Sequence, residues 1–396
     1  MDDNHSIGIV TFTFGTNYGC HLQRYALQTV CERLGFRPRA ILVSEDALRQ
    51  NKLKRAEHRV KRFLKFVCPI QFYDSFFDAQ NRRQKAFHDF ERAFLRTTKK
   101  FHSYASIKAN ASFGFDAWIA GSDQIWNPFF TKNPTFYDFF MLDFAPNEKK
   151  VAYAPSIGVS RIADKYVERF RRLSSCRFLS TREFEGSREL ERILGREVPT
   201  VVDPTLLLTS KDWDVVAIRA RPLETSRYIL CYSLGNLEPV LRRAKAVQKT
   251  LHCEIVFLEE DIKTTRAIKK IGGADVIVAK NAGPCEFVNY VKHAECVVTD
   301  SYHGTIFSIV YRRPFFTMKR DVENAEKSMN SRIFTLFSML QLENRLFDPS
   351  NEQTIAEADL YVDYDNVKKL LQERVEFSLN YLKNALYTTA GKPNVS

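Results

Sequence analysis

The sequence predicts an α/β protein of two domains, each with a parallel β-sheet. The chain opens with a β-rich run at 7–14, turn residues, helical spacing of apolar residues at 21–34 and a second strand at 37–44. This order is that of a βαβ unit, whose strands run parallel. A second alternation of strands and helices starts near residue 227, as in a further α/β domain. The length of 396 residues and the 44% content of apolar residues are sufficient for two cores.

The first domain is predicted to span residues 1–218. Residues 46–100 are rich in Lys, Arg and Phe and poor in strand signals, so we expect a helical insertion there. The sheet is predicted to resume in four short runs, at 115–120, 150–154, 176–180 and 199–202. Residues 219–227 are expected to form a linker.

The second domain is predicted to span residues 226–345. Its strands are expected at 227–233, 254–258, 275–278, 295–299 and 314–318, and its main helices at 238–250, 284–293, 303–312 and 331–341. Apolar residues recur at helical spacing from 366 to 386, which predicts a long amphipathic helix within residues 365–388.

The net charge of +12 favours anionic partners, although a solvated basic surface explains it equally well. A nucleic acid is not expected, because no recognised binding module accompanies the charge. The sequence has neither a long apolar window nor a basic leader at its start, so we expect a cytoplasmic location. The eight Cys form no CxxC pair, which favours reduced thiols over disulfides or a zinc site.

Functional residues are expected after the strands, because ligands of open α/β sheets bind at the carboxyl ends of the strands. After the first strand, Asn17 and Tyr18 offer hydrogen bonds and a stacking face, or form a plain turn with a helix cap. After the strand at 115–120, Asp123 is a candidate general base or a turn cap. Trp126, in the same loop, is a candidate for the cleft or for the core.

Cations also follow the strands. Arg182 lies at the strand-to-helix junction that follows the strand at 176–180, where a guanidinium can bind a carboxylate or phosphate, or pair with a nearby Glu. Lys319 and Arg320 follow the last predicted strand of the second domain, and Arg332 opens the next helix. These side chains are predicted to converge on an anion.

The most specific segment is 297–315, in which an apolar strand leads through Ser301 and Tyr302 to His303 at the start of a helix. The unpaired amides and dipole of a helix N-terminus favour an anion. His303 is therefore a candidate active-site residue, and a His that caps the turn is the alternative.

Several common motifs are missing from the sequence: GxGxxG, GxxxxGK[ST] and HExxH. Dinucleotide-binding, P-loop and zinc-hydrolase functions have no support, and we expect neither a cofactor nor a metal.

The chain resembles the polysaccharide pyruvyl transferase family in ordered segments from about residue 7 to 345. The matching segments are IGIVTF with TNYGCHLQRYALQ, DAWIAGSDQIWNP, VAYAPSIG, Arg182-Glu183 with Gly186, VVDPTLLL, VTDSYHGTIFSI, NSRI and LENR.

The resemblance implies two facing Rossmann-like domains of the GT-B type, with a last helix that returns to the first domain. It also implies transfer of pyruvate from phosphoenolpyruvate to a sugar as a ketal, in the synthesis of exopolysaccharide or capsule for the cell envelope. His303 would be the acid, and Asp123 is our candidate base. The expected donor-binding residues are Arg182, Ser301, Tyr302, Arg332 and Lys319, and the expected acceptor-binding residues are Asn17, Tyr18 and Trp126.

One departure bears on the donor. Some family members carry Arg-Leu where this chain has Ser301-Tyr302, so a cation is missing and Arg332, Lys319 or Arg320 would replace it. Two alternatives remain at this point: a GT-B glycosyltransferase that uses a nucleotide sugar, and a non-catalytic membrane-associated binding protein.

A basic helix is predicted between residues 49 and 66, with eight Lys and Arg, one Glu and an apolar stripe. This pattern is typical of a helix on an anionic membrane surface, which would bring a lipid-linked glycan to the cleft. A helix that packs its stripe on the sheet and solvates its charges fits the pattern as well.

Overall fold

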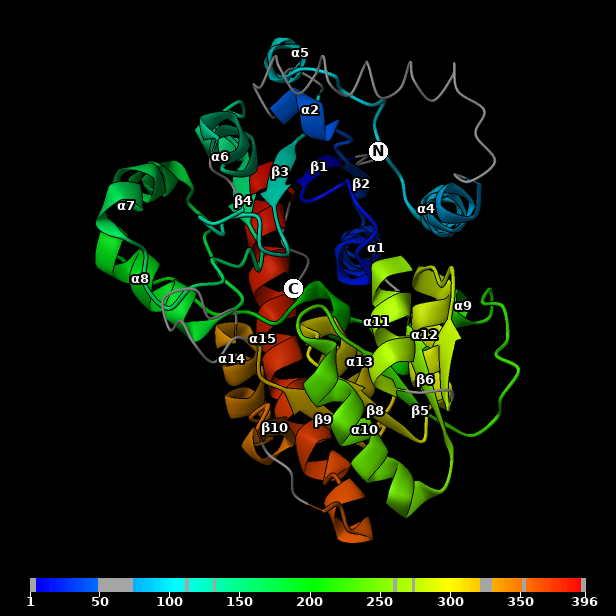
Figure 1. The fold of residues 1–396 in the computed structure, drawn as a ribbon. Coiled ribbons are helices and arrows are strands. Elements are labelled where there is room, and N and C mark those ends of the chain that lie inside the picture. Colours follow the sequence, from blue (N-terminus) through cyan, green and yellow to red (C-terminus); the bar gives the residue numbers. More distant parts are fainter. Residues whose placement is uncertain are drawn as a thin grey trace.

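The computed structural model describes residues 5–48, 74–110, 114–130, 133–258, 262–272, 275–320, 330–350 and 354–392. Within these ranges the chain forms two α/β domains, each built on a parallel sheet with helices packed against it (Figure 1). The predicted α/β class is confirmed. The basic segment predicted at 49–66 lies outside the described residues.

The first sheet has the strand order β2-β1-β3-β4 in the described part of the chain. Its strands are β1 (Ser6–Val10), β2 (Arg37–Ala40), β3 (Ala117–Ala120) and β4 (Lys150–Ala152). Its helices are α1 (Tyr18–Arg33), α2 (Glu45–Leu48), α4 (Asp74–Phe94), α5 (Tyr104–Ala109), α6 (Pro134–Phe140), α7 (Asp164–Arg171), α8 (Phe184–Leu194) and α9 (Ser210–Ala217).

Two predicted strands of this domain, at 176–180 and 199–202, are wrong as regular strands. Each makes only an isolated bridge, Val151 with Phe178 and Thr181 with Thr200. Beyond the first bridge, the Ser180 hydroxyl donates to the Ala152 carbonyl at 2.8 Å and accepts from the Ala154 amide at 3.2 Å. A side chain thus takes the place of backbone pairing beside β4.

The second sheet has the order β10-β9-β8-β5-β6-β7 among the described residues. Its strands are β5 (Tyr228–Tyr232), β6 (Glu254–Leu258), β7 (Val276–Ala279), β8 (Cys296–Thr299), β9 (Phe315–Met318) and β10 (Leu346–Phe347). Its helices are α10 (Leu237–Leu251), α11 (Ile262–Gly272), α12 (Pro284–His293), α13 (Tyr302–Val310) and α14 (Ser331–Leu340). The five predicted strands lie within one residue of the observed ones.

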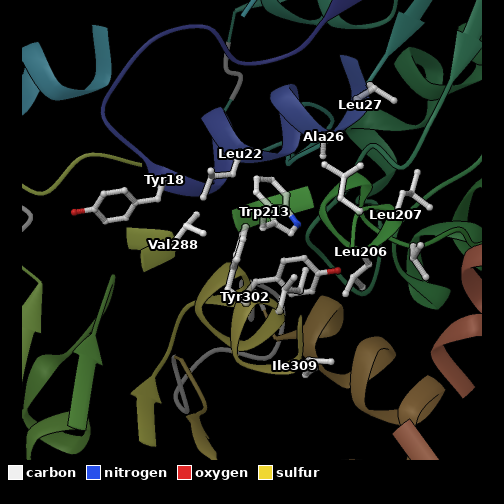
Figure 2. Packing of buried hydrophobic residues seen from close by; sticks show 14 of the residues in the cluster. Tyr18, Leu22, Ala26, Leu27, Leu206, Leu207, Trp213, Val288, Tyr302 and Ile309 are labelled. Carbon is white, nitrogen blue, oxygen red and sulfur yellow. The ribbon is translucent and has the colours of Figure 1, made fainter. Parts of the chain in front are cut away.

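One hydrophobic cluster joins the two domains. Figure 2 shows Leu22 and Ala26 of α1 on one side of Trp213, with Tyr302 and Ile309 of α13 on the other. Burial of such large apolar side chains is the main favourable contribution to folding. The segment just ahead of the predicted linker therefore packs on the second domain as well as the first.

Helix α15 (Tyr364–Ala390) runs along both domains (Figure 1). Near its start, the Tyr364 hydroxyl donates to the Ser308 carbonyl at 3.3 Å, in the second domain. Farther along, Tyr381 donates to Ala152 at 3.2 Å and Tyr387 to Leu34 at 3.3 Å, both in the first domain. The helix therefore contacts both domains and connects them.

Helix α4 belongs to the region predicted as a helical insertion, and it packs on α1. An ionic cluster makes this contact: the half-buried Glu91 lies 2.7 Å from Nη2 of the buried Arg24 and 3.2 Å from Nε2 of the buried His21. Among the helices that the structure describes, none is both long and apolar enough to cross a membrane.

Candidate active site

A cavity of about 260 Å³ lies between the domains, where loops from both sheets meet. The residues that line it mostly follow the carboxyl ends of strands, as expected for open α/β sheets. From the first domain they are Phe12, Asn17, Cys20, Asp123, Gln124 and Phe130; from the second they are Leu234, Ser301, Tyr302, His303, Arg320 and Arg332.

One wall of the cavity carries positive charge. Arg332, in the first turn of α14, is buried, and its guanidinium lies 5.4 Å from the centre of the Tyr302 ring. Burial, together with the charges of Arg182 and Arg320, lowers the pKa of Arg332 to about 10, so the side chain is still charged at neutral pH. The repulsion among these guanidiniums would be relieved by a bound anion.

Two neighbours support this wall. In one of the two orientations of the Gln124 side-chain amide, its oxygen accepts from both Nη atoms of Arg332 at 3.2 Å. Arg320 Nη2 lies 3.5 Å from an Asp300 carboxylate oxygen. The two guanidiniums are thereby held at the cavity and directed by polar groups of both domains.

Arg182 lies outside the residues that line the cavity. It is buried, binds Asp203 through Nη1, and has Nη2 at 3.6 Å from Asp123. Its guanidinium also packs 4.6 Å from the Tyr302 ring centre. Burial opposes the charge of Arg182, but Asp203 and the other nearby anionic groups outweigh it and raise its pKa. The arrangement makes Arg182 a support for the two carboxylates and for Tyr302.

Asp203 joins the domains beneath the cavity. It is fully buried, and it accepts hydrogen bonds from the Thr205 amide at 3.0 Å and hydroxyl at 2.6 Å. Its other oxygen binds Arg182 and lies 3.7 Å from His303 Nε2. Burial would raise the pKa of Asp203, but Arg182 and His303 hold it well below its usual value, so the carboxylate is charged.

His303 lies in the first turn of α13 and is buried at the cavity wall. One edge of its ring faces Asp203, and another packs on Gly19 of α1. A Cβ at position 19 would come 2.0 Å from His303 Nδ1, which is too short for a contact between non-bonded atoms. Glycine at this position thus leaves the room that the imidazole occupies.

Asp123 lies across the cavity, in the loop that follows β3. Its Oδ2 accepts from the Cys20 thiol at 2.7 Å, and its Oδ1 accepts from the backbone N–H of Gln124 at 2.8 Å. Burial would raise the pKa of Asp123, but Arg182, His303 and the Cys20 hydrogen bond outweigh it and keep the pKa below its usual value. Burial and the Asp123 charge raise the pKa of the Cys20 thiol well above its ordinary value, so the thiol stays protonated as a donor.

The loops of the second domain are fixed by Asp300 and Ser301. Asp300 accepts from the amides of Leu234 at 2.7 Å and Gly235 at 2.9 Å. Ser301 is the N-cap of α13 and accepts from the Gly304 amide at 3.3 Å, as this residue type commonly does. The amides at the start of α13 are thus ordered beside the cavity.

Besides Arg182, three further predicted site residues lie outside the cavity lining: Tyr18, Trp126 and Lys319. The Tyr18 ring is stacked between Phe287 and Phe87 in the interdomain core, so neither face is open to a substrate. Trp126 is fully buried, and its Nε1 donates to the Phe140 carbonyl at 3.1 Å.

Lys319 pairs with Asp348 at 2.9 Å. Lys319 and Arg320 both follow β9, which ends at Met318, and Arg320 is the one that reaches the cavity. By contrast, six of the candidate residues line the cavity: Asn17, Asp123, Ser301, Tyr302, His303 and Arg332.

The sequence reasoning missed Asp203, Cys20 and Phe130 as site residues. Asp203 directly follows the apolar run at 199–202, so the rule that places ligands after strands could have identified it. Cys20 and Phe130 carried no such signal. Across the described ranges, no three His, Cys, Asp or Glu side chains gather as ligands for a metal ion.

Comparisons with known proteins address the family and the fold. A family model described as polysaccharide pyruvyl transferase matches residues 17–321. A search of curated proteins finds no match. A UDP-N-acetylglucosamine 2-epimerase has a similar structure, with a TM-score of 0.54 and 12% sequence identity over 98% of this chain and 96% of that chain.

The UDP-GlcNAc 2-epimerase from Methanocaldococcus jannaschii is also similar, with a TM-score of 0.50 and 13% identity over 95% of this chain and 93% of that chain. At such identities the likeness concerns the fold alone. Two facing α/β domains with parallel sheets make this fold GT-B-like, as the sequence resemblance implied.

Proposed function

Because the chain belongs to the polysaccharide pyruvyl transferase family, we propose that it transfers a pyruvyl group from phosphoenolpyruvate to a sugar. The product is a ketal on a cell-surface polysaccharide or its lipid-linked precursor, and phosphate is released. The observation that carries this proposal is the small cavity with Arg320, Arg332 and His303 beside the start of α13. Its volume of about 260 Å³ is below the roughly 300–1,000 Å³ of drug-sized ligand sites, which favours a small anion over a whole nucleotide sugar.

In this proposal the donor binds through its two anionic groups. Arg332 and Arg320 bind the phosphate and the carboxylate, for which planar guanidiniums are well suited. The amides at the start of α13, ordered by Ser301, favour negative charge as well. Arg182 acts indirectly, by holding Tyr302 and the carboxylates of Asp123 and Asp203 in position.

The chemical step uses His303 as the acid and Asp123 as the base. His303 gives a proton to the methylene carbon of phosphoenolpyruvate, and positive charge develops at C2. One sugar hydroxyl forms a bond to C2, the bond from C2 to the phosphate oxygen breaks, and a second hydroxyl closes the ketal. Asp123 accepts the hydroxyl protons. One of them restores His303 and the other leaves with the phosphate, so the step is balanced.

Asp203 is the positioning residue for His303. Its carboxylate is fixed by Thr205 and Arg182 and lies 3.7 Å from the ring nitrogen. A fixed anion there orients the imidazole and offers a partner for its positive charge. A general acid of this kind typically contributes a factor of about 10²–10⁴ in rate.

Phosphate release tests the proposed function. Purified protein is incubated with phosphoenolpyruvate and a panel of lipid-linked or aryl glycosides, and phosphate and pyruvylated product are measured together. Glycoside-dependent phosphate release with a matching yield of ketal supports the proposal. Release of a nucleotide from nucleotide sugars, without reaction of phosphoenolpyruvate, would show the alternative, a GT-B glycosyltransferase.

The donor site is tested in the same assay. Arg332→Lys keeps the charge but loses the planar fork, so the donor KM rises more than the acceptor KM. Lys319→Ala is the matched control, because Lys319 pairs with Asp348 and should leave the donor KM unchanged. Equal changes in both KM values for Arg332→Lys would instead indicate a structural role.

The lipid-linked acceptor is the reason to propose peripheral association with an anionic membrane through the basic segment at 49–66. Sedimentation with anionic liposomes at low and high salt tests it. Salt-sensitive binding that is lost when Arg55, Arg59 and Arg62 become Glu supports the proposal, and no binding at low salt contradicts it.

A further inference from the structure

The cavity has an apolar side as well as a cationic one. Phe12, Phe130 and Leu234 line it together. Phe12 is fixed by an edge contact with Phe140 at 5.1 Å between ring centres. Phe130 is 51% exposed, so its ring is accessible to a ligand that enters the cavity. An exposed aromatic ring at the rim of a ligand cavity indicates a contact surface for a substrate.

The loop that carries this ring also carries the candidate base. Asn127 closes a turn in it: its carbonyl accepts from the Phe130 amide at 3.2 Å and its side chain from the Phe129 amide at 2.9 Å. Trp126 anchors the same loop through its hydrogen bond to Phe140. The position of Phe130 is therefore fixed relative to Asp123.

We infer that Phe130 is the platform on which the acceptor sugar lies, with one C–H face of its pyranose ring against the phenyl ring. This inference rests on the proposed function. The anionic donor is drawn to the arginines and His303, so the acceptor enters from the apolar side. A pyranose has a face of C–H groups that packs on an aromatic ring, while its hydroxyls, at the ring edge, point towards Asp123.

Kinetics with paired variants tests the platform. Phe130→Ala raises the acceptor KM about five- to tenfold, the size of a lost aromatic contact, with the donor KM within about twofold. Phe130→Tyr retains the ring and a near-normal acceptor KM. Phe129→Ala is the matched control, because Phe129 is the adjacent residue and is 42% exposed but lies outside the cavity lining. An equal rise for Phe129→Ala, or equal rises in both KM values, overturns the inference.

A second measurement separates this inference from the proposed reaction. Saturation-transfer NMR detects binding of methyl glycosides to the full chain without phosphoenolpyruvate. Transfer to the ring C–H protons that is lost in Phe130→Ala and retained in Phe129→Ala supports the platform, even if no pyruvyl transfer occurs. The inference is overturned by any of three results: glycoside binding that is unchanged in Phe130→Ala, binding that requires an aryl or lipid aglycone, or no glycoside binding at all.

Discussion

At the scale of single residues, the proposed activity depends on one imidazole held between two domains. His303→Ala is expected to lower kcat at least about 100-fold, the lower end of what a general acid contributes. The melting temperature should change little, because the ring is at a cavity wall. His293→Ala is the matched control, since His293 is exposed on α12 and should leave kcat unchanged. Activity of His303→Ala within threefold of wild type would remove this residue from the mechanism.

Gly19→Ala tests the packing of that imidazole without touching its chemistry. The new methyl group cannot coexist with the observed ring position, because the Cβ would lie 2.0 Å from Nδ1. We expect kcat to fall at least about tenfold as His303 is displaced. Overpacking of a buried position typically costs about 1–3 kcal/mol, and Gly19 is buried, so the melting temperature should fall, and kcat is measured well below it.

Gly186→Ala provides the comparison for Gly19→Ala. Gly186 also lies in the first turn of a helix, and a Cβ there would meet its nearest neighbours at 3.3 Å. The Gly186→Ala variant should therefore keep nearly full activity. If both variants lose activity equally, the effect comes from helix geometry and not from His303.

The sequence could predict which loops form the site, but it could not predict which way each side chain points. Asn17 and Tyr18 are adjacent, yet one lines the cavity and the other is stacked on Phe287, more than 200 residues away in the chain. The same holds for Lys319 and Arg320 after β9. The direction of each side chain depends on contacts between segments that are distant in the sequence. Local sequence patterns carry no information on these contacts.

At the scale of helices, the contact between α1 and α4 depends on an ionic cluster. Glu91 binds Arg24 and His21, and removing its carboxylate leaves the buried charge of Arg24 uncompensated. Glu91→Gln is expected to lower the free energy of unfolding by about 3 kcal/mol at pH 7. Glu168→Gln is the control, because Glu168 pairs with Arg171 on the surface and should cost less than about 1 kcal/mol. Denaturant titration measures both.

The same cluster predicts a dependence on pH. Burial would raise the pKa of Glu91, but His21 and Arg24 outweigh it and lower the pKa to about 2. A carboxylate with a depressed folded pKa stabilises the fold fully above its unfolded pKa, and this contribution is lost as the pH falls. Wild-type protein should therefore lose more stability than Glu91→Gln between about pH 5 and pH 2. Parallel curves for the two proteins would contradict this assignment.

Periodicity predicted the strands and helices of the second domain well, because buried parallel strands there are continuous apolar runs between amphipathic helices. It failed at 176–180 and 199–202. In the first of these segments, the Ser180 side chain takes the place of backbone pairing beside β4. Strand length and pairing depend on such details, which composition does not reveal.

At the scale of the whole molecule, α15 holds the domains in one arrangement. Leu382 is fully buried in the cluster that spans both domains. Leu382→Ala is expected to destabilise the protein by about 2–5 kcal/mol, as large-to-small changes in cores do. Phe377→Ala on the same helix is the control, because Phe377 is 49% exposed and should cost little. Equal effects of the two would mean that the helix is not anchored at Leu382.

The interdomain position of Trp213 has a spectroscopic consequence. Its indole is buried, lies 4.7 Å from the Phe307 ring of α13 and 5.5 Å from the Tyr25 ring of α1, and donates to the Thr205 carbonyl. Trp118 and Trp126 are buried within the first domain alone. Opening of the domains is expected to expose Trp213 to water and to leave Trp118 and Trp126 buried. The emission wavelength of Trp213 would then report domain movement, which stopped-flow fluorescence can follow without an added label.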